Sequence, residues 1–522
     1  MRIHDFFFTV QRPQHILRYF LAPTMAVLVI ILASQTAVSQ ESLLVAENSW
    51  IRVQNVGDDP AMLEVSHYGR SGKVTASEIC PGEFCAAVPP GSGWTFFTET
   101  NLDLAAGFYG STKITGEQPF VAVAGKDSLI SGTDGWYLTI GGDSYWQGGA
   151  SNKLILPLVE YTAEKSSILH IQNASSDSPT CIVISYFIES SLDIIALEPD
   201  NSSVQCPEGG LYLEPNESIV RNRRSFPFEI GFSGSAIIET SPVQSGDFST
   251  SASEQAIVAS VDTVSADGIS FSSYRGFADS EAGKDIVLPI IQRGVATSGY
   301  FSGEIWSTRF RITAANPSVS TTANILFNGA MPDGTEFEAD HEVSIYSSIT
   351  CDQDMEGLDA CLPDQVSLPS GFSGTVRISS DENIAVVVQR VSESGISGDY
   401  RGFTAREAGT QVVLPVVNKT LSPWGGHSGW NSTVHVQPFD GGTATVSFFY
   451  FSKDLPKGGF YRSVGEIVGS KTVHQGDDRF LPDDWIGSLI VVSTRPVVVL
   501  VNLENAGFKG DPIMMYNGVS LE

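Results

Sequence analysis

The sequence predicts an all-β protein, a tandem array of four antiparallel Ig-like β-sandwich domains after a signal peptide. Residues 274–291 (YRGFADSEAGKDIVLPII) and 400–417 (YRGFTAREAGTQVVLPVV) are near-copies, so the chain repeats one folding unit. Short segments with alternating apolar and polar residues recur between turn residues, as is typical of β-sandwiches. No segment keeps the 3.6-residue period of an amphipathic helix.

The repeated phrase divides the chain into units. Units begin with Leu-Pro at Leu156-Pro157, Leu288-Pro289 and Leu414-Pro415, and they end with Tyr-x-Gly at Tyr274, Tyr400 and Tyr516, with a looser ending at Tyr145. The predicted division is a signal peptide (1–39) and four β-sandwich repeats (40–152, 153–284, 285–411 and 412–522). The phrase itself is expected to be a joint between units, with each proline at the edge or start of a strand.

Within each unit the strands are predicted in one order. An alternating first strand occurs at residues 50–55, 168–173, 310–316 and 434–437, and a second strand at 63–68, 182–186 and 445–450 makes a hairpin with it. A later strand opens with Gly-Ser or Gly-Thr at 110, 234, 374 and 487, and an apolar run such as 496–501 follows and must be central. Units about 30 Å long, placed end to end, would form a rod on the order of 120 Å, or a bent chain if the linkers hinge.

The order of these phrases resembles uncharacterised tandem repeats of secreted and cell-surface bacterial proteins, notably of the Chloroflexota type. The matching segments are 412–416 (VVLPV), Trp430 with 434–437 (VHVQ), and 371–375 (GFSGT). The resemblance covers nearly the whole mature chain, but the first unit lacks the leading Leu-Pro and carries Tyr109 in its Gly-Phe phrase. It implies an extracellular location and a β-sandwich architecture, and it carries no agreed activity.

The N-terminus predicts export. Three arginines precede an uncharged run from Tyr19 to Gln40, and residues 37–39 (AVS) supply the small residues of a signal-peptidase site. We expect cleavage near Ser39 rather than an uncleaved anchor, because the apolar run 26–33 is short for a membrane span. The mature chain would then be secreted or held on the cell surface, with no membrane span.

The six cysteines agree with an oxidising compartment. Two lie in each of the first three units, and pairing within units is the simplest connectivity. The expected disulfides are Cys80–Cys85, Cys181–Cys206 and Cys351–Cys361. Zinc-type CxxC spacing does not occur.

Charge and motifs exclude several function classes. The formal net charge is −29, and about −31 without residues 1–39, which repels nucleic acid. GxSxG, HExxH, P-loop and GxGxxG motifs are absent. His170 and His435 occupy the same repeat position and are expected to face outward from a strand. We therefore expect no enzyme and no cofactor, with one weak exception.

That exception is a candidate calcium loop between Cys351 and Cys361. Asp352, Asp354 and Glu356 match the first three ligand positions of a calcium loop, Gly357 matches its turn, and Asp359 adds a carboxylate. The glutamate expected at position 12 is replaced by Pro363. The alternative is a solvated acidic turn that the disulfide closes without metal.

A second candidate is a sugar-binding loop in the fourth unit. Trp424 and Trp430 flank the glycine-rich segment 425–429, which could present aromatic faces to a glycan. The alternative for Trp430 is packing at the sandwich end, as for Trp50 and Trp306, which also open first strands. Trp424 is left open between the two interpretations.

Every recurrent residue is a turn, core or linker residue. We therefore expect a non-enzymatic extracellular or cell-surface protein with a structural or adhesive role. The alternative is a carbohydrate-binding module array without a catalytic site; a hydrolase would need a carboxylate pair that the sequence does not identify. The partner is unknown, with a polysaccharide or another copy of the chain as candidates, and self-assembly through a sheet edge is expected at the last unit.

Overall fold

The computed structural model describes residues 43–82, 85–132, 135–146, 149–198, 205–245, 248–297, 303–353, 361–362, 367–421, 429–452, 459–505 and 507–521. Over these residues the protein consists of β-strands and short 3-10 turns, with no α-helix. The predicted all-β class is confirmed.

The described strands fall into four consecutive groups, each with an outer sheet and an inner sheet. In the first group the outer sheet has the order β3-β2-β5 and the inner sheet β4-β1-β6-β7. Their bounds are β1 (Leu43–Asn55), β2 (Leu63–Gly69), β3 (Val74–Cys80), β4 (Gly93–Phe97), β5 (Gly110–Gly116), β6 (Phe120–Gly132) and β7 (Gly135–Trp146), with a 3-10 turn η2 (Thr98–Thr100).

The second group has the outer order β11-β10-β14-β8-β19 and the inner order β13-β9-β17-β18, with β12 also on β10. The bounds are β8 (Lys153–Tyr161), β9 (Lys165–Asn173), β10 (Thr180–Ile188), β11 (Ile194–Glu198), β12 (Leu211–Leu213), β13 (Ser218–Arg221), β14 (Phe232–Ser241), β17 (Ile257–Ser265), β18 (Phe271–Arg275) and β19 (Phe277–Ala278). The serine-rich insertion forms a small ribbon of β15 (Val243–Ser245) and β16 (Phe248–Thr250), followed by η3 (Ala252–Glu254).

The third and fourth groups repeat this order, and in each one long strand runs through both sheets. In the third group β26 pairs with β20 and β23 in the outer sheet and with β22 and β27 in the inner sheet. The bounds are η4 (Asp279–Glu281), β20 (Gly283–Arg293), β21 (Val295–Ala296), β22 (Ile305–Ala314), β23 (Thr321–Ala330), β24 (Glu336–Ile345), β25 (Ser348–Asp352), β26 (Phe372–Ser392), β27 (Ser397–Arg401) and β28 (Phe403–Thr404).

In the fourth group β34 takes the same place. The bounds are β29 (Gly409–Lys419), β30 (Asn431–Pro438), β31 (Thr443–Phe451), β32 (Phe460–Val468), β33 (Lys471–His474), η5 (Gln475–Asp477), β34 (Trp485–Glu504), β35 (Lys509–Asp511), β36 (Ile513–Asn517) and β37 (Val519–Ser520). The apolar run 496–501 lies in β34 between β30 and β36, so its prediction as a central segment is confirmed.

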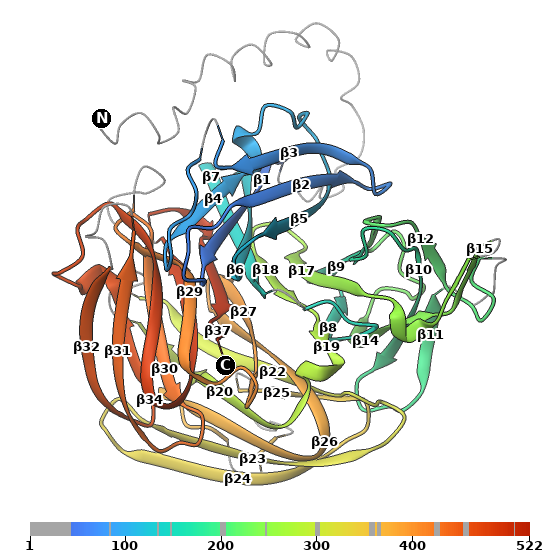
Figure 1. Ribbon diagram of the computed structural model, residues 1–522. Coiled ribbons are helices and arrows are strands. Elements are labelled where there is room, and N and C mark those ends of the chain that lie inside the picture. The colour runs from blue at the N-terminus through green and yellow to red at the C-terminus, as the bar shows by residue number, and fades with distance from the viewer. Residues whose placement is uncertain are drawn as a thin grey trace, which may run out of the picture.

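The four groups close into a ring (Figure 1). The last strands of the four inner sheets, β7, β18, β27 and β36, contact one another in a cycle, and β35 pairs in parallel with β7. The expected rod is therefore wrong: the first and last groups are neighbours. The hydrophobic clusters explain the closure, because Val123, Leu138 and Ile140 of the first group pack into the core of the fourth.

In each of the last three groups, a tyrosine of the repeated phrase contacts the residue that follows the proline of the Leu-Pro strand. The prolines lie within strands rather than at their starts, on a part that pairs with one neighbour only, and the strand register shifts at Pro157, Pro289 and Pro415. The residue after each proline does not pair with the neighbouring strand. A tyrosine hydroxyl instead hydrogen-bonds to its backbone N–H and C=O groups. Tyr274 Oη, for example, accepts from Leu158 N (3.1 Å) and donates to Leu158 O (2.7 Å).

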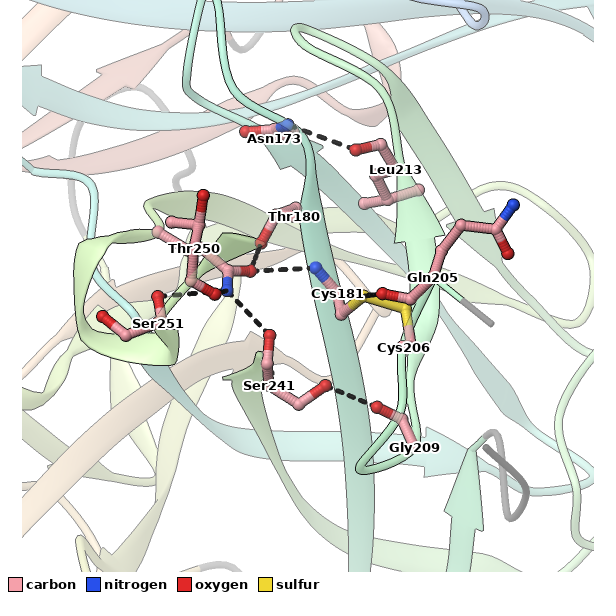
Figure 2. The surroundings of a disulfide bond; sticks show 11 residues. Asn173, Thr180, Cys181, Gln205, Cys206, Gly209, Leu213, Ser241, Thr250 and Ser251 are labelled. Atoms are coloured by element: carbon pink, nitrogen blue, oxygen red, sulfur yellow. Dashed lines mark hydrogen bonds between the residues drawn. A yellow bond between two sulfur atoms is a disulfide. The ribbon is translucent and has the colours of Figure 1, made fainter. Parts of the chain in front are cut away.

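The three expected disulfides are present: Cys80–Cys85, Cys181–Cys206 and Cys351–Cys361. The second ties β10 to the segment before β12, beside the hydrogen bond from Ser241 to Gly209 (Figure 2). Both of its cysteines are fully buried.

Candidate functional site

A cleft with a volume of about 1130 Å³ lies between the first and second groups. One wall comes from β1, β5 and β6, and the other from β9, β17 and β18. Apolar side chains of Ile51, Phe120 and Ala122 line the first wall, whereas His170 and Asp262 line the second. Both walls mix the two kinds, because Lys113 and Lys126 also line the first and Ile171 and Val258 also line the second.

The cleft lies where the first group lacks a strand. In the second group β14 pairs with β10 on one edge and with the Leu-Pro strand β8 on the other. In the first group the corresponding strand β5 pairs with β2 alone among the described residues. Because the first unit has no Leu-Pro segment, no described strand occupies this edge of its outer sheet.

A line of polar side chains crosses the mouth of the cleft. Tyr109 Oη lies 2.9 Å from His170 Nδ1, and His170 Nε2 lies 2.9 Å from Asp262 Oδ2. Lys126 Nζ binds the same Asp262 oxygen at 3.3 Å and Glu47 at 3.1 Å. Burial favours the neutral form of Asp262, but His170 and Lys126 hold its pKa well below the ordinary value.

This line joins the two groups rather than activating a nucleophile. Burial raises the pKa of Tyr109, so its hydroxyl stays protonated at neutral pH. Its ring also stacks with His170 at 6.0 Å between centroids, and the Arg70 guanidinium lies 4.6 Å from the ring centroid. The arrangement fixes Tyr109 in place as a contact between the first and second groups.

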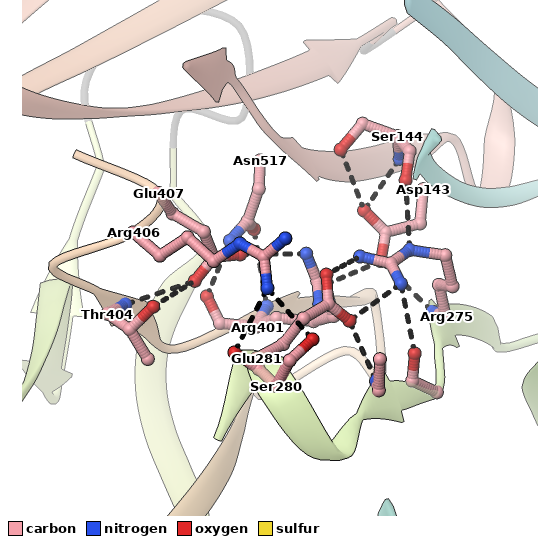
Figure 3. A network of polar contacts seen from close by, with 12 residues as sticks. Asp143, Ser144, Arg275, Ser280, Glu281, Arg401, Thr404, Arg406, Glu407 and Asn517 are labelled. Atoms are coloured by element: carbon pink, nitrogen blue, oxygen red, sulfur yellow. Dashed lines mark hydrogen bonds and ion pairs between the residues drawn. The ribbon is translucent and has the colours of Figure 1, made fainter. Parts of the chain in front are cut away.

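The axis of the ring holds a second cluster of charged groups (Figure 3). Arg275 binds both carboxylate oxygens of Glu281 at 2.9 Å, and Arg401 binds Glu407 at 2.8 Å. Asp143 accepts from Arg275 N at 3.0 Å and lies 3.3 Å from Arg401 Nε, so it links three groups.

The axis cluster is buried and largely self-satisfied. Burial opposes the ionisation of Glu281, but Arg275 and Arg401 keep its pKa below the ordinary value. Burial raises the pKa of Glu407, against the opposing effect of Arg401. Three carboxyl groups thus share two guanidinium groups. The cluster is suited to holding the groups together, because its side chains do not face solvent.

A further buried carboxyl, that of Asp511, also joins several groups. Asp511 accepts from Phe271 N (3.0 Å) and Ser397 N (2.9 Å) and from the hydroxyls of Ser270 and Ser397 (both 3.0 Å). These donors come from the second and third groups, whereas Asp511 belongs to the fourth. Burial raises the pKa of Asp511 well above its ordinary value, although the four hydrogen bonds oppose the shift.

The predicted site residues lie elsewhere. Asp354, Glu356 and Asp359 of the calcium candidate are outside the described residues, and Asp352 ends β25 in a half-buried position. Trp424 is also outside them, whereas Trp430 is 9% exposed and packs in the core of the fourth group near Phe508. Within the described ranges, no group of three or more histidine, cysteine or acidic residues could hold a metal ion.

Sequence reasoning missed both the cleft and the axis. His170 does face outward from its strand, as expected, but it meets Tyr109 of the preceding group. The Arg–Glu pair of the axis was visible in the sequence, because the same six-residue spacing separates Arg275 from Glu281 and Arg401 from Glu407. For the cleft, the signal in the sequence was the absence of a Leu-Pro segment from the first unit, which leaves one edge of β5 unpaired among the described residues.

Comparisons with known proteins add little. No protein-family model matches the chain, and no curated protein matches it. Among solved structures, a tetra-tandem repeat in the extending region of a large adhesion protein aligns over 90% of this chain and 94% of that one, with 12% identity and a TM-score of 0.10. That likeness is too low to support an argument. No helix in the described part of the chain has the length and apolarity to cross a membrane.

Proposed function

We propose that the chain is a non-enzymatic extracellular protein with a structural or adhesive role, exported by residues 1–39 and built from four Ig-like sandwich repeats. Three disulfides fit an oxidising compartment. The strongly acidic composition keeps such a protein soluble and disfavours nucleic acid as a partner.

One observation carries the proposal: the recurrent polar residues are used to build the ring. The tyrosine hydroxyls of the repeated phrase bind backbone groups of the Leu-Pro strands, and its arginines bind buried glutamates. Hydroxyl and guanidinium groups that make such buried contacts do not face a substrate. The described clusters therefore support a rigid scaffold better than a catalytic centre.

The two weaker predictions remain open to test. A carbohydrate-binding array now rests on Trp424, because the burial of Trp430 leaves little of its ring to offer a sugar. A structural calcium ion between Cys351 and Cys361 is testable by isothermal titration of the full chain with calcium. No heat at millimolar calcium would remove that site from consideration.

The main proposal is tested on cells of the native organism. Protease shaving of intact cells should degrade the protein while a cytoplasmic marker survives, and mature protein should begin near Gln40. A deletion strain should lose attachment or surface integrity and regain it on complementation. Recovery of the protein in the cytoplasmic fraction, or unchanged attachment and surface properties after deletion, would contradict the proposal.

A further inference from the structure

In the outer sheet of the first group, β5 lacks, among the described residues, a neighbour that the corresponding strand has in each of the other three groups. In the last three groups the strand that opens with Gly-Ser or Gly-Thr has neighbours on both sides, and one of them is the Leu-Pro strand. On the corresponding strand β5, one edge has no backbone partner in the described part of the chain. Its residues are half-buried or exposed, whereas those of β14 are mostly buried.

The cleft lies along this open edge. Residues 109–114, which include most of β5, line it in sequence, as expected where a strand presents its backbone to the space. Ile51, Phe120 and Ala122 form an apolar floor that belongs to the interior of the first sandwich. The inner sheet of the second group, through β9 and β17, closes the far side.

We propose that this cleft is an acceptor for a β-strand of another polypeptide, which pairs antiparallel with β5 and completes the first sandwich. The inference deepens the proposed adhesive function and rests on it, because it names the kind of partner that the scaffold joins. An unpaired strand edge beside an apolar floor provides both requirements of strand addition: backbone hydrogen bonds and pockets for alternate side chains.

The chain itself supplies the chemistry of the occupant. The corresponding edge is filled by residues 154–159 (LILPLV) in the second group, 286–291 (IVLPII) in the third and 412–417 (VVLPVV) in the fourth. All three segments are uncharged and apolar and have proline at the bulge. A segment of six residues spans about 20 Å, which suits the seven residues of β5.

The charges of the lining fit such a segment. Lys113, Lys126 and Arg275 are balanced by Glu47, Glu99 and Asp262, although the chain as a whole carries a net charge of −29. A lining without net charge neither attracts nor repels an uncharged strand. A charged segment would lose its hydration in the cleft, and this lining offers it no net opposite charge in return. Uncharged apolar peptide is therefore the matching class.

Tyr109, one of the aromatic residues that line the cleft, favours peptide over sugar. A sugar ring stacks on a free aromatic face, but Tyr109 has His170 stacked against it and the Arg70 guanidinium over its ring. The unpaired backbone of β5 is a feature that an extended peptide can use along its whole length. A glycan is the competing occupant that the experiment must separate.

The test uses the mature chain, residues 40–522, and a fluorescein-labelled peptide with the sequence of residues 153–161 (KLILPLVEY). Fluorescence anisotropy should show saturable binding that a scrambled peptide of the same composition lacks. Hydrogen exchange on the wild-type complex should show new protection, at least tenfold in rate, of the alternate amides of Gly110–Gly116 that do not bond to β2. This second measurement does not depend on the folding of any variant.

A matched pair of variants localises the binding. Ala124→Trp fills the floor of the cleft and should weaken peptide binding at least tenfold. Ala405→Trp, in an exposed turn of the third group, should leave it within twofold.

Any of three results with the peptide would overturn the strand acceptor. They are the absence of saturable binding, equal binding of the scrambled peptide, and binding without protection of β5. Binding of a glycan that Ala124→Trp abolishes, with no peptide binding, would assign the cleft to sugar and also overturn it. Cell-surface location and attachment are measured separately, so the strand acceptor can fail while the adhesive function stands.

Discussion

Replacement of Asp399 by asparagine should remove a pH-dependent loss of stability. Asp399 lies on β27 and is 2% exposed. Its Oδ2 accepts from Ser272 Oγ at 2.8 Å and from Gln389 Nε2 at 3.4 Å, whereas Oδ1 has no hydrogen-bond partner among the described residues. Burial raises the pKa of Asp399 to about 6, although Ser272 opposes the shift.

The sign follows from proton linkage. The folded state binds this proton more tightly than the unfolded chain, whose aspartate pKa is about 3.9. The contribution of Asp399 to stability is therefore fully present below pH 4 and is lost as the pH rises through about 6. A shift of about two pKa units corresponds to about 3 kcal/mol. Asparagine has nearly the same shape and does not ionise, so its contribution does not depend on pH.

The expected result is a change in the difference between the two proteins. The free energy of unfolding of Asp399→Asn minus that of wild type should rise by about 2–3 kcal/mol between pH 4 and pH 7. Urea denaturation followed by tryptophan fluorescence at each pH measures it, with the exposed Asp59→Asn as the matched control. A difference that stays constant, or falls with pH, would refute the assigned burial of this carboxylate.

Three further changes test the tyrosine contact at the bulge, the charged cluster at the axis and one disulfide. Tyr400→Phe should lower the free energy of unfolding by about 1–3 kcal/mol, because both backbone groups of Ile290 lose their partner. Glu281→Gln should lower it by about 3–5 kcal/mol, because the buried Arg275 loses the carboxylate that both of its terminal nitrogens bind. The double change Cys351→Ser and Cys361→Ser should cost about 2–3 kcal/mol, since the disulfide closes a loop of 10 residues. Thermal unfolding and urea titration measure all three.

Matched controls separate these effects from nonspecific damage. Tyr461 is 55% exposed, so Tyr461→Phe should change stability by less than about 0.5 kcal/mol. Loss of the 25-residue-separated pair Cys181–Cys206 should cost more than loss of Cys351–Cys361. Equal stabilities of Tyr400→Phe and Tyr461→Phe, or a neutral Glu281→Gln, would contradict the roles assigned to the bulge and the axis.

Local features of the fold could be predicted because they depend on neighbouring residues. Alternation in segments such as 168–173 predicts β9, and the apolar run 496–501 predicts the central part of β34. The bulge at Pro289 could not be predicted in this way. Its partner, the Tyr400 hydroxyl, lies 110 residues further along the chain.

The ring could not be predicted because its contacts join surfaces that look solvent-facing in sequence. Polar residues such as Ser397 and Asp399 on β27 are typical of an exposed strand, yet they bind partners in neighbouring groups and are buried. The cleft depends on the same kind of contact between groups, since one of its walls is the inner sheet of the second group. The absence of a Leu-Pro segment from the first unit could be read in the sequence. Only the strand order of the other groups shows that this segment pairs with the strand that corresponds to β5.

The parallel pairing of β35 with β7 imposes an order on biosynthesis. About 360 residues separate the two strands, so at about 5–20 residues per second β7 waits about 20–70 s for its neighbour to be made. During that time Leu138 and Ile140 have no core to enter. A nascent chain of this protein thus exposes these apolar side chains until β35 and the rest of the fourth group have been made.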